Sequence, residues 1–101
     1  MFSGGSYHEV GRWLWNFLTS HAKRVDPRLE VELEAGDERE GKSYGARLRF
    51  GRLVSPVMEF DYREVADSRG SLAWCSALAE RTQGLARARL AAERAADAGA
   101  R

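Results

Sequence analysis

Charged and apolar residues alternate in three segments in the middle of the chain. Acidic residues recur at every second position within residues 28–35, basic residues within 44–50, and acidic residues again within 58–62. Because successive side chains of a strand point to opposite faces, each segment would have one polar and one apolar face. The pattern predicts three strands whose apolar faces share a core.

The signs of the charges predict how these strands lie beside one another. In an antiparallel meander the basic segment would lie between the two acidic ones. The residues that would share the outer face of the sheet are Glu30, Glu32 and Glu34, then Arg47 and Arg49, then Glu59 and Asp61. Opposite charges on adjacent strands attract by ~0.2–1 kcal/mol per pair. We therefore expect these charges to neutralise one another without an outside partner.

The connection before the third strand allows two interpretations. Residues 50–53 have the pattern of a two-residue turn with Gly51 in its first position. With this turn, strict alternation would place Glu59 in the core and Phe60 in solvent, against the apolar pattern. We expect either a plain loop in this connection or a bulge near Ser55–Pro56 that resets the register. Because proline cannot donate to a ladder, the third strand would be an edge strand.

An amphipathic helix is predicted over residues 7–24. The apolar stripe at helical spacing consists of Tyr7, Val10, Leu14, Phe17, Leu18, His21 and Val25. Ser6 and Glu9 have the spacing of a capping box, which satisfies backbone N–H groups at a helix start. Pro27 disfavours the helical conformation in the residue before it, so the helix would end there.

A second helix is predicted to begin in the cluster of Asp, Ser, Arg and Gly at residues 67–71. Its central apolar stripe consists of Trp74, Leu78 and Leu85. A second stripe, roughly 100–120° around the helix, consists of Leu72, Ala79, Ala86 and Leu90. We expect this helix to end near residue 94. Residues 1–5 and about 95–101 are expected to be disordered.

The element order is helix, three strands, helix, which predicts an α+β fold in a single domain over residues 1–101. A two-layer arrangement buries the central apolar stripes when both helices lie on the apolar face of a three-stranded antiparallel sheet. A chain of 101 residues has room for one such core.

The composition narrows the class of protein. The net charge of +1 produces no overall field that would attract nucleic acid or an anionic membrane. No apolar run approaches the ~20 residues of a membrane span, no signal peptide is evident, and Cys75 is the single cysteine. These features favour the cytosol. Abundant Arg and Ala indicate a GC-rich bacterial genome, and scarce Asn, Gln, Cys and Met indicate adaptation to heat.

Few residues could carry chemistry. His8, His21 and Cys75 are the only soft metal ligands in the sequence, whereas a structural zinc site uses four ligands and a catalytic site three. Helical spacing places His21 and Cys75 on or beside apolar stripes, which favours a core histidine next to an inert cysteine. No spacing links a serine or Cys75 to a histidine and a carboxylate. We predict no metal, no cofactor and no enzyme activity.

The element order resembles that of the double-stranded RNA-binding domain. That family contacts RNA through its first helix, its first hairpin loop and the start of its last helix. At these places the cations of this chain are Arg12, Lys23, Arg24, Arg39, Lys42 and Arg69, and the anions are Glu9, Asp37, Glu38, Glu40 and Asp67. The cations exceed the anions by one, whereas phosphate binding requires clustered cations. The resemblance implies nucleic-acid binding as the alternative function, without the basic motif of the family.

The tryptophans indicate an interaction surface. Trp13 and Trp15 would lie on opposite sides of the stripe of the first helix, where a three-stranded sheet could not cover both. Together with the second stripe of the other helix, the candidate interface consists of Trp13, Trp15, Leu72, Ala79, Ala86 and Leu90. We predict a protein-interaction module that forms a homodimer through its helices or binds another protein, with no membrane or small-molecule ligand. The alternative is a monomer in which the first helix packs against the second stripe.

Overall fold

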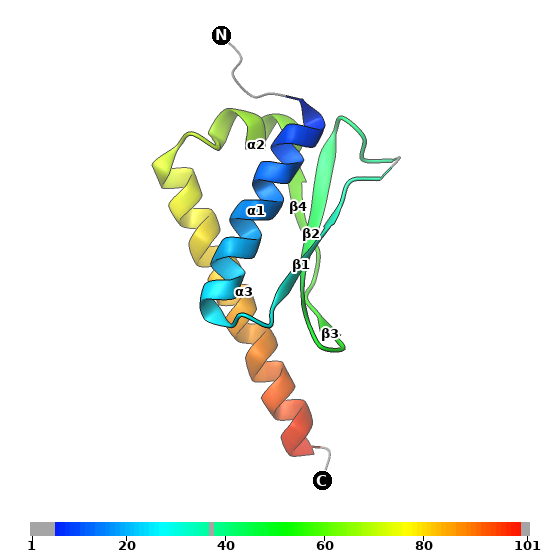
Figure 1. Ribbon diagram of the computed structural model, residues 1–101, viewed down its shortest axis with the longest axis vertical. Helices are drawn as coiled ribbons and strands as arrows, with labels where there is room; N and C mark the ends of the chain where they lie inside the picture. Colours follow the sequence, from blue (N-terminus) through cyan, green and yellow to red (C-terminus); the bar gives the residue numbers. More distant parts are fainter. Residues whose placement is uncertain (1–5, 37, 100–101) are drawn as a thin grey trace.

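The protein has two layers, with helices on one face of an antiparallel sheet (Figure 1). A computed structural model describes residues 6–36 and 38–99. The elements are α1 (Tyr7–Val25), β1 (Glu30–Glu34), β2 (Ser43–Phe50), β3 (Leu53–Val54), β4 (Met58–Asp61), α2 (Tyr62–Ser68) and α3 (Leu72–Gly99). The predicted α+β fold is confirmed, and α1 and α3 pack together over the apolar face of the sheet. The order has one short strand and one short helix more than the sequence predicts.

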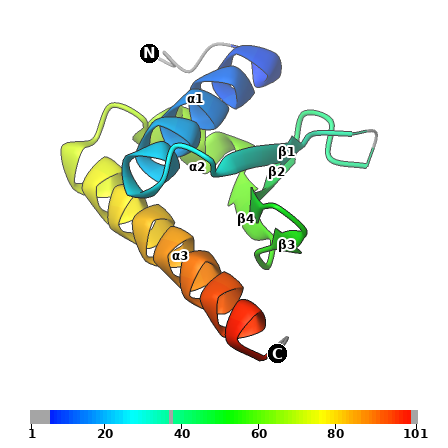
Figure 2. The same cartoon turned by 60° about the horizontal axis from the view of Figure 1, so that its bottom comes forward.

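A serine caps the N-terminus of each long helix. The Ser6 hydroxyl accepts a hydrogen bond from the Glu9 N–H at 3.2 Å, and the Ser71 hydroxyl accepts one from the Trp74 N–H at 3.2 Å. These bonds satisfy N–H groups that have no partner within the helix. α3 continues to Gly99, beyond the end near residue 94 that the sequence predicts, and its second half extends past the strands (Figure 2). The expected disorder of residues 1–5, 100 and 101 lies outside the described residues.

β2 is the central strand of the sheet. It pairs with β1 on one side and, on the other, with β3 and β4, which share one edge. Between the pairs Arg49↔Val54 and Ala46↔Met58, β2 contributes residues 47–48 whereas the opposite edge contributes residues 55–57. The extra residue is a bulge, as the second interpretation predicts, and it returns Phe60 to the core.

The turn before this bulge has the predicted form. Phe50 pairs with Leu53, which leaves a two-residue turn, and Gly51 has a φ of 63°. A positive φ is accessible to glycine without a steric penalty. At the bulge, the Ser55 hydroxyl accepts a hydrogen bond from the Leu48 N–H at 2.8 Å, where a regular strand would provide a carbonyl oxygen. A side chain thus replaces the backbone acceptor that the bulge displaces.

The end of the last strand differs from the prediction. The sequence predicts a strand through Tyr62, but Tyr62 is the first residue of α2. The Asp61 carboxylate accepts a hydrogen bond from the Glu64 N–H at 3.0 Å, so Asp61 caps a helix. It therefore does not serve as the predicted partner of the basic strand.

The charges of the outer face pair as predicted on one side of β2 only. Arg47 and Arg49 both bind the Glu32 carboxylate, at 2.8 Å and 2.7 Å. Glu59 instead binds Arg39, which comes from the connection between β1 and β2. The register explains this correction, because the residue opposite Glu59 is Gly45 and Arg47 lies beside the bulge. A Cβ atom at Gly45 would lie 2.8 Å from the end of the Arg39 side chain, so Arg39 crosses the sheet directly over Gly45 and would have to shift to admit a larger residue.

Candidate functional site

The predicted interface residues do not form one surface. Trp13 is half-buried, with its ring 5.1 Å from that of Phe17 and 6.3 Å from that of Trp74. Ala86 is fully buried in the core, Leu90 packs against the core, and Ala79 is half-buried. Only Leu72, at 86% exposed, and Trp15, at 40%, remain largely accessible.

The rotation of α3 explains why part of its second stripe, Ala86 and Leu90, faces inward. α3 buries Leu78, Thr82 and Ala86, which recur every four residues along one side of the helix. Thr82 is a polar residue, and its hydroxyl donates to the Leu78 carbonyl oxygen at 2.8 Å. Because this bond satisfies the hydroxyl, Thr82 can lie at the centre of the buried side.

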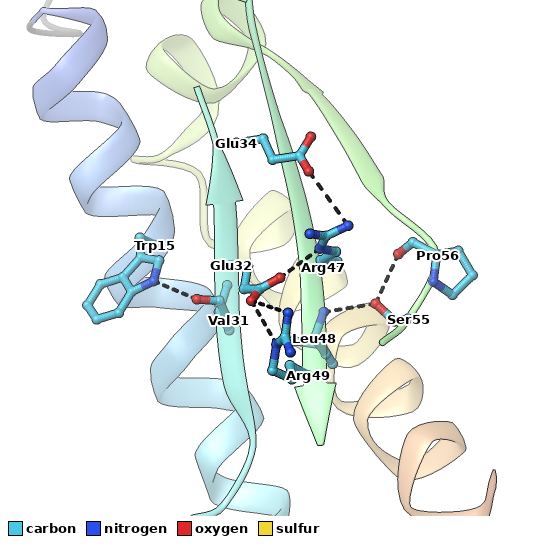
Figure 3. A network of polar contacts seen from close by, with 9 residues as sticks. All are labelled: Trp15, Val31, Glu32, Glu34, Arg47, Leu48, Arg49, Ser55 and Pro56. Carbon is cyan, nitrogen blue, oxygen red and sulfur yellow. Dashed lines mark hydrogen bonds and ion pairs between the residues drawn. The ribbon is translucent and has the colours of Figure 1, made fainter. Parts of the chain in front are cut away.

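Trp15 contacts the edge of the sheet. Its indole Nε1–H donates to the carbonyl oxygen of Val31 in β1, with an N···O distance of 2.9 Å (Figure 3). β1 pairs only with β2, so its other side is an edge of the sheet. Trp15 is therefore exposed at an edge of the sheet and takes no part in a contact between the described helices.

The backbone groups of Val31 and Leu33 point away from β2. Residues of an antiparallel strand alternate between those that bond one neighbour and those that bond the other. Leu48 lies opposite Val31 and bonds the far side, because its carbonyl accepts from the Ser55 N–H at 2.8 Å. Val31, and Leu33 two residues later, must then direct their N–H and C=O groups toward the open edge. Among the described residues, the Val31 carbonyl is the only one of these outward-facing groups with a hydrogen-bond partner, which is the Trp15 indole.

An apolar groove of about 310 Å³ lies between α1 and this edge. We call it the β1 groove, and it is lined by Tyr7, His8, Gly11, Arg12, Trp15, Leu33, Ala35 and Tyr44. Gly11 allows α1 to approach the floor closely, since a Cβ atom there would lie 2.9 Å from the Tyr44 ring. The Tyr44 hydroxyl donates to the Tyr7 carbonyl, and the Tyr7 hydroxyl donates to the Ser43 carbonyl. Burial raises the pKa of both tyrosines, so the floor is neutral.

Carboxylates line the outer face of the same edge. Glu32 accepts hydrogen bonds from Arg49 and Arg47, which hold its pKa below the ordinary value. Glu34 lies 3.7 Å from Arg47, and no ion pair joins Glu30 to another described residue. The Glu30 charge also acts on Arg49, and the Glu34 charge acts on Arg39, which binds Glu59. Counted with Glu59 and Arg39, four carboxylates face three guanidinium groups, so one negative charge is left over.

The histidines and the cysteine considered as metal ligands or catalytic groups do not form a shared site. The His21 ring lies 4.5 Å from that of Phe17, and burial, followed by the nearby Arg24, lowers its pKa. The Cys75 thiol lies 3.5 Å from the Arg69 carbonyl oxygen, and His8 is exposed beside Glu40. Across residues 6–36 and 38–99, no three His, Cys, Asp or Glu side chains are grouped to hold a metal ion.

The sequence does not predict the β1 groove. Alternating residues predict that β1 is a strand, but nothing in the sequence shows which edge of the sheet stays open. Gly11, in the middle of a helical stripe, was the one available signal, because glycine within a helix indicates a close approach to another element.

Comparisons of the chain with protein-family models, curated proteins and solved structures found no match in any of the three. Within the described part of the chain, no helix has both the length and the apolar character needed to cross a bilayer.

Proposed function

We propose that the protein is a non-enzymatic interaction module that binds an extended segment of another protein as an additional strand along β1. The observation that carries this proposal is the open edge of β1 beside an apolar groove. In recognition of this type, backbone bonds provide affinity and pockets for alternate side chains provide specificity. On composition alone, we place the protein in the bacterial cytosol.

The geometry supports both contributions. Leu33 offers an N–H and a C=O group to the added strand, and Val31 offers an N–H group. Side chains of the added strand that point to the same face as Leu33 would enter the β1 groove. The strand would reach the Val31 carbonyl only after displacing the Trp15 indole, which makes Trp15 one boundary of the site.

Self-association through the helices is less well supported than the sequence suggests. Ala86 and Leu90 contribute to the core of a single chain, and Trp13 packs against Phe17 and Trp74. This packing supports the monomer alternative. Nucleic-acid binding is supported by the element order alone, and Arg39, one of its six candidate cations, is bound by Glu59.

The proposal can be tested with three labelled peptides of roughly ten residues. Valine would alternate with serine in the first, with arginine in the second and with glutamate in the third. We expect at least one of them to shift the Trp15 indole and Leu33 amide signals in NMR spectra of the ¹⁵N-labelled protein. If none of the three moved these signals, or if duplex RNA moved them in a salt-dependent manner instead, the proposal would be overturned.

A pair of variants isolates the backbone contribution. Leu33→Pro removes the N–H group that points to the open edge, whereas Leu33→Val shortens the side chain and keeps that group. Proline is tolerated on sheet edges because this N–H is not used by the β1–β2 ladder. We expect Leu33→Pro to weaken peptide binding at least about tenfold more than Leu33→Val, with circular dichroism confirming that both fold. Equal binding by the two variants would contradict strand addition.

A further inference from the structure

We infer that the segment bound along β1 alternates basic and apolar residues, with its cations on the outer face of the sheet. This inference rests on the proposed function and specifies the chemistry of the partner. Residues directly opposite in adjacent strands share a face, so every second side chain of the added strand would lie beside the carboxylates of β1. The remaining side chains would lie in the β1 groove.

The unequal pairing of the three carboxylates supports cations on the outer face. Glu32 lies within 2.8 Å of both arginines of β2, whereas Glu34 has one contact at 3.7 Å. Glu30 is exposed and forms no ion pair with another described residue. Glu30 and Glu34 flank Glu32 on the same face. Glu30 acts on Arg49 and Glu34 on Arg39 through charge alone, so each carboxylate can also accept a hydrogen bond from a cation on the open side.

β2 provides an internal example of such a partner. Its arginines lie directly opposite two of these carboxylates, in the pairs Glu30↔Arg49 and Glu32↔Arg47. Between them, Leu48 points to the core and is fully buried. A second strand with the same alternation would place equivalent groups on the other side of β1.

The other face of the added strand requires apolar side chains. Most of the lining of the β1 groove is apolar or aromatic, including Trp15, Leu33 and Ala35. Its polar members, His8 and Arg12, lie on an exposed part of α1. Arg12 would repel a cation that entered from this side. Both faces of β1 therefore favour an added strand with its cations on the outer face and its apolar side chains in the groove.

The same charges argue against a second copy of this chain at the site. If β1 paired with β1 of another molecule, the carboxylates of both strands would share one face and lie opposite each other. Like charges directly opposite across a ladder are destabilising. Only Glu32 has its charge compensated by two arginines within the chain. The charge complementarity therefore selects a basic segment from a different protein.

Affinities of the three peptides described above test this inference. We expect the arginine peptide to bind about tenfold more tightly than the serine peptide, and the glutamate peptide to bind more weakly than either. The advantage of arginine should decrease as salt concentration increases, because the carboxylates are exposed. Binding of all three with equal affinity would overturn the inference and leave strand addition intact, whereas binding of none would overturn strand addition itself.

Two variants assign the preference to β1. The double substitution Glu30→Gln and Glu34→Gln should reduce the advantage of the arginine peptide to about threefold or less while the serine peptide binds unchanged. The double substitution Glu64→Gln and Glu80→Gln, which removes two exposed carboxylates from α2 and α3, is the matched control and should preserve the full advantage. An equal reduction in both variants would show that overall charge, and not the edge of β1, attracts the peptide.

Discussion

The two edges of the sheet are protected in similar ways but to different extents. At each edge, a side chain from a helix donates to one outward-facing carbonyl, Trp15 to Val31 at 2.9 Å and Arg89 to Val54 at 3.0 Å. The second edge is also interrupted by the bulge and by Pro56, whereas β1 is a regular strand of five residues. An unprotected regular edge is a template for another strand, which natural proteins usually avoid.

The difference shows where this fold permits a partner. β3 and β4 are both short, and Pro56 between them has no N–H group to donate to another strand. The β1 edge retains open backbone groups beside a groove. The comparison predicts that changes at the bulge affect mainly stability and that changes at β1 affect mainly binding.

The largest expected effect on stability is at the bulge. Ser55→Ala removes the hydroxyl that accepts from the Leu48 N–H and donates to the Pro56 carbonyl. Because Ser55 is only 5% exposed, the Leu48 N–H would be left buried without a partner. We expect the free energy of unfolding in urea to decrease by about 2 kcal/mol. The control Ser76→Ala, at an exposed position of α3, should change it by less than about 0.5 kcal/mol, and equal effects would contradict this role of Ser55.

A smaller effect is expected where a helix contacts each edge. Trp15→Phe removes the donor to the Val31 carbonyl and keeps an aromatic ring, so we expect a loss of about 1 kcal/mol in urea unfolding. Arg89→Met removes the equivalent donor at Val54 and should cost a similar amount. Only Trp15→Phe should strengthen binding of the arginine peptide, because it leaves the Val31 carbonyl available. If both variants changed peptide affinity equally, the two edges would not differ in the way proposed.

The smallest effect concerns acid and the ion pairs beside β1. Arg49 and Arg47 lower the pKa of Glu32 below 4.5, so the stability that this carboxylate contributes is present above about pH 4.5 and decreases as the pH falls through the lower, folded-state pKa. Glu32→Gln should therefore differ from the native protein most at neutral pH and least in acid, as measured by urea unfolding over a pH series. Glu59→Gln provides the equivalent change at β4, where Arg39 lowers the pKa of Glu59. A difference that increased on acidification would contradict the lowered pKa.

Local signals predicted much of the fold. The serine cap of α1, the turn at Gly51 and the bulge near Ser55 could all be recognised because each depends on residues close in sequence. The bulge was one of two resolutions of a conflict between the turn and the position of Phe60, the other being a plain loop.

The remaining features depend on contacts between distant residues. The pairing of Arg39 with Glu59 joins residues 20 positions apart, with the Arg39 side chain lying over Gly45. Alternation within a single strand carries no information about such a contact. The inward position of Ala86 depends on how α3 is rotated against the core, and this rotation buries Thr82, whose hydroxyl is satisfied within the helix. The candidate site was hidden for the same reason, because its backbone groups are identified only by strand pairing.

The bulge at residues 55–57 has a consequence for how the length of this chain can vary. Deleting one of these residues would leave two residues opposite Arg47 and Leu48, so the pairs Arg49↔Val54 and Ala46↔Met58 would both fit one regular ladder. Phe60 would stay buried, because alternation counted from Leu53 would then match the apolar pattern of β4. Engineered chains should therefore tolerate the loss of one residue between β3 and β4, whereas regular pairing at the present length would turn Phe60 to water and Glu59 into the core.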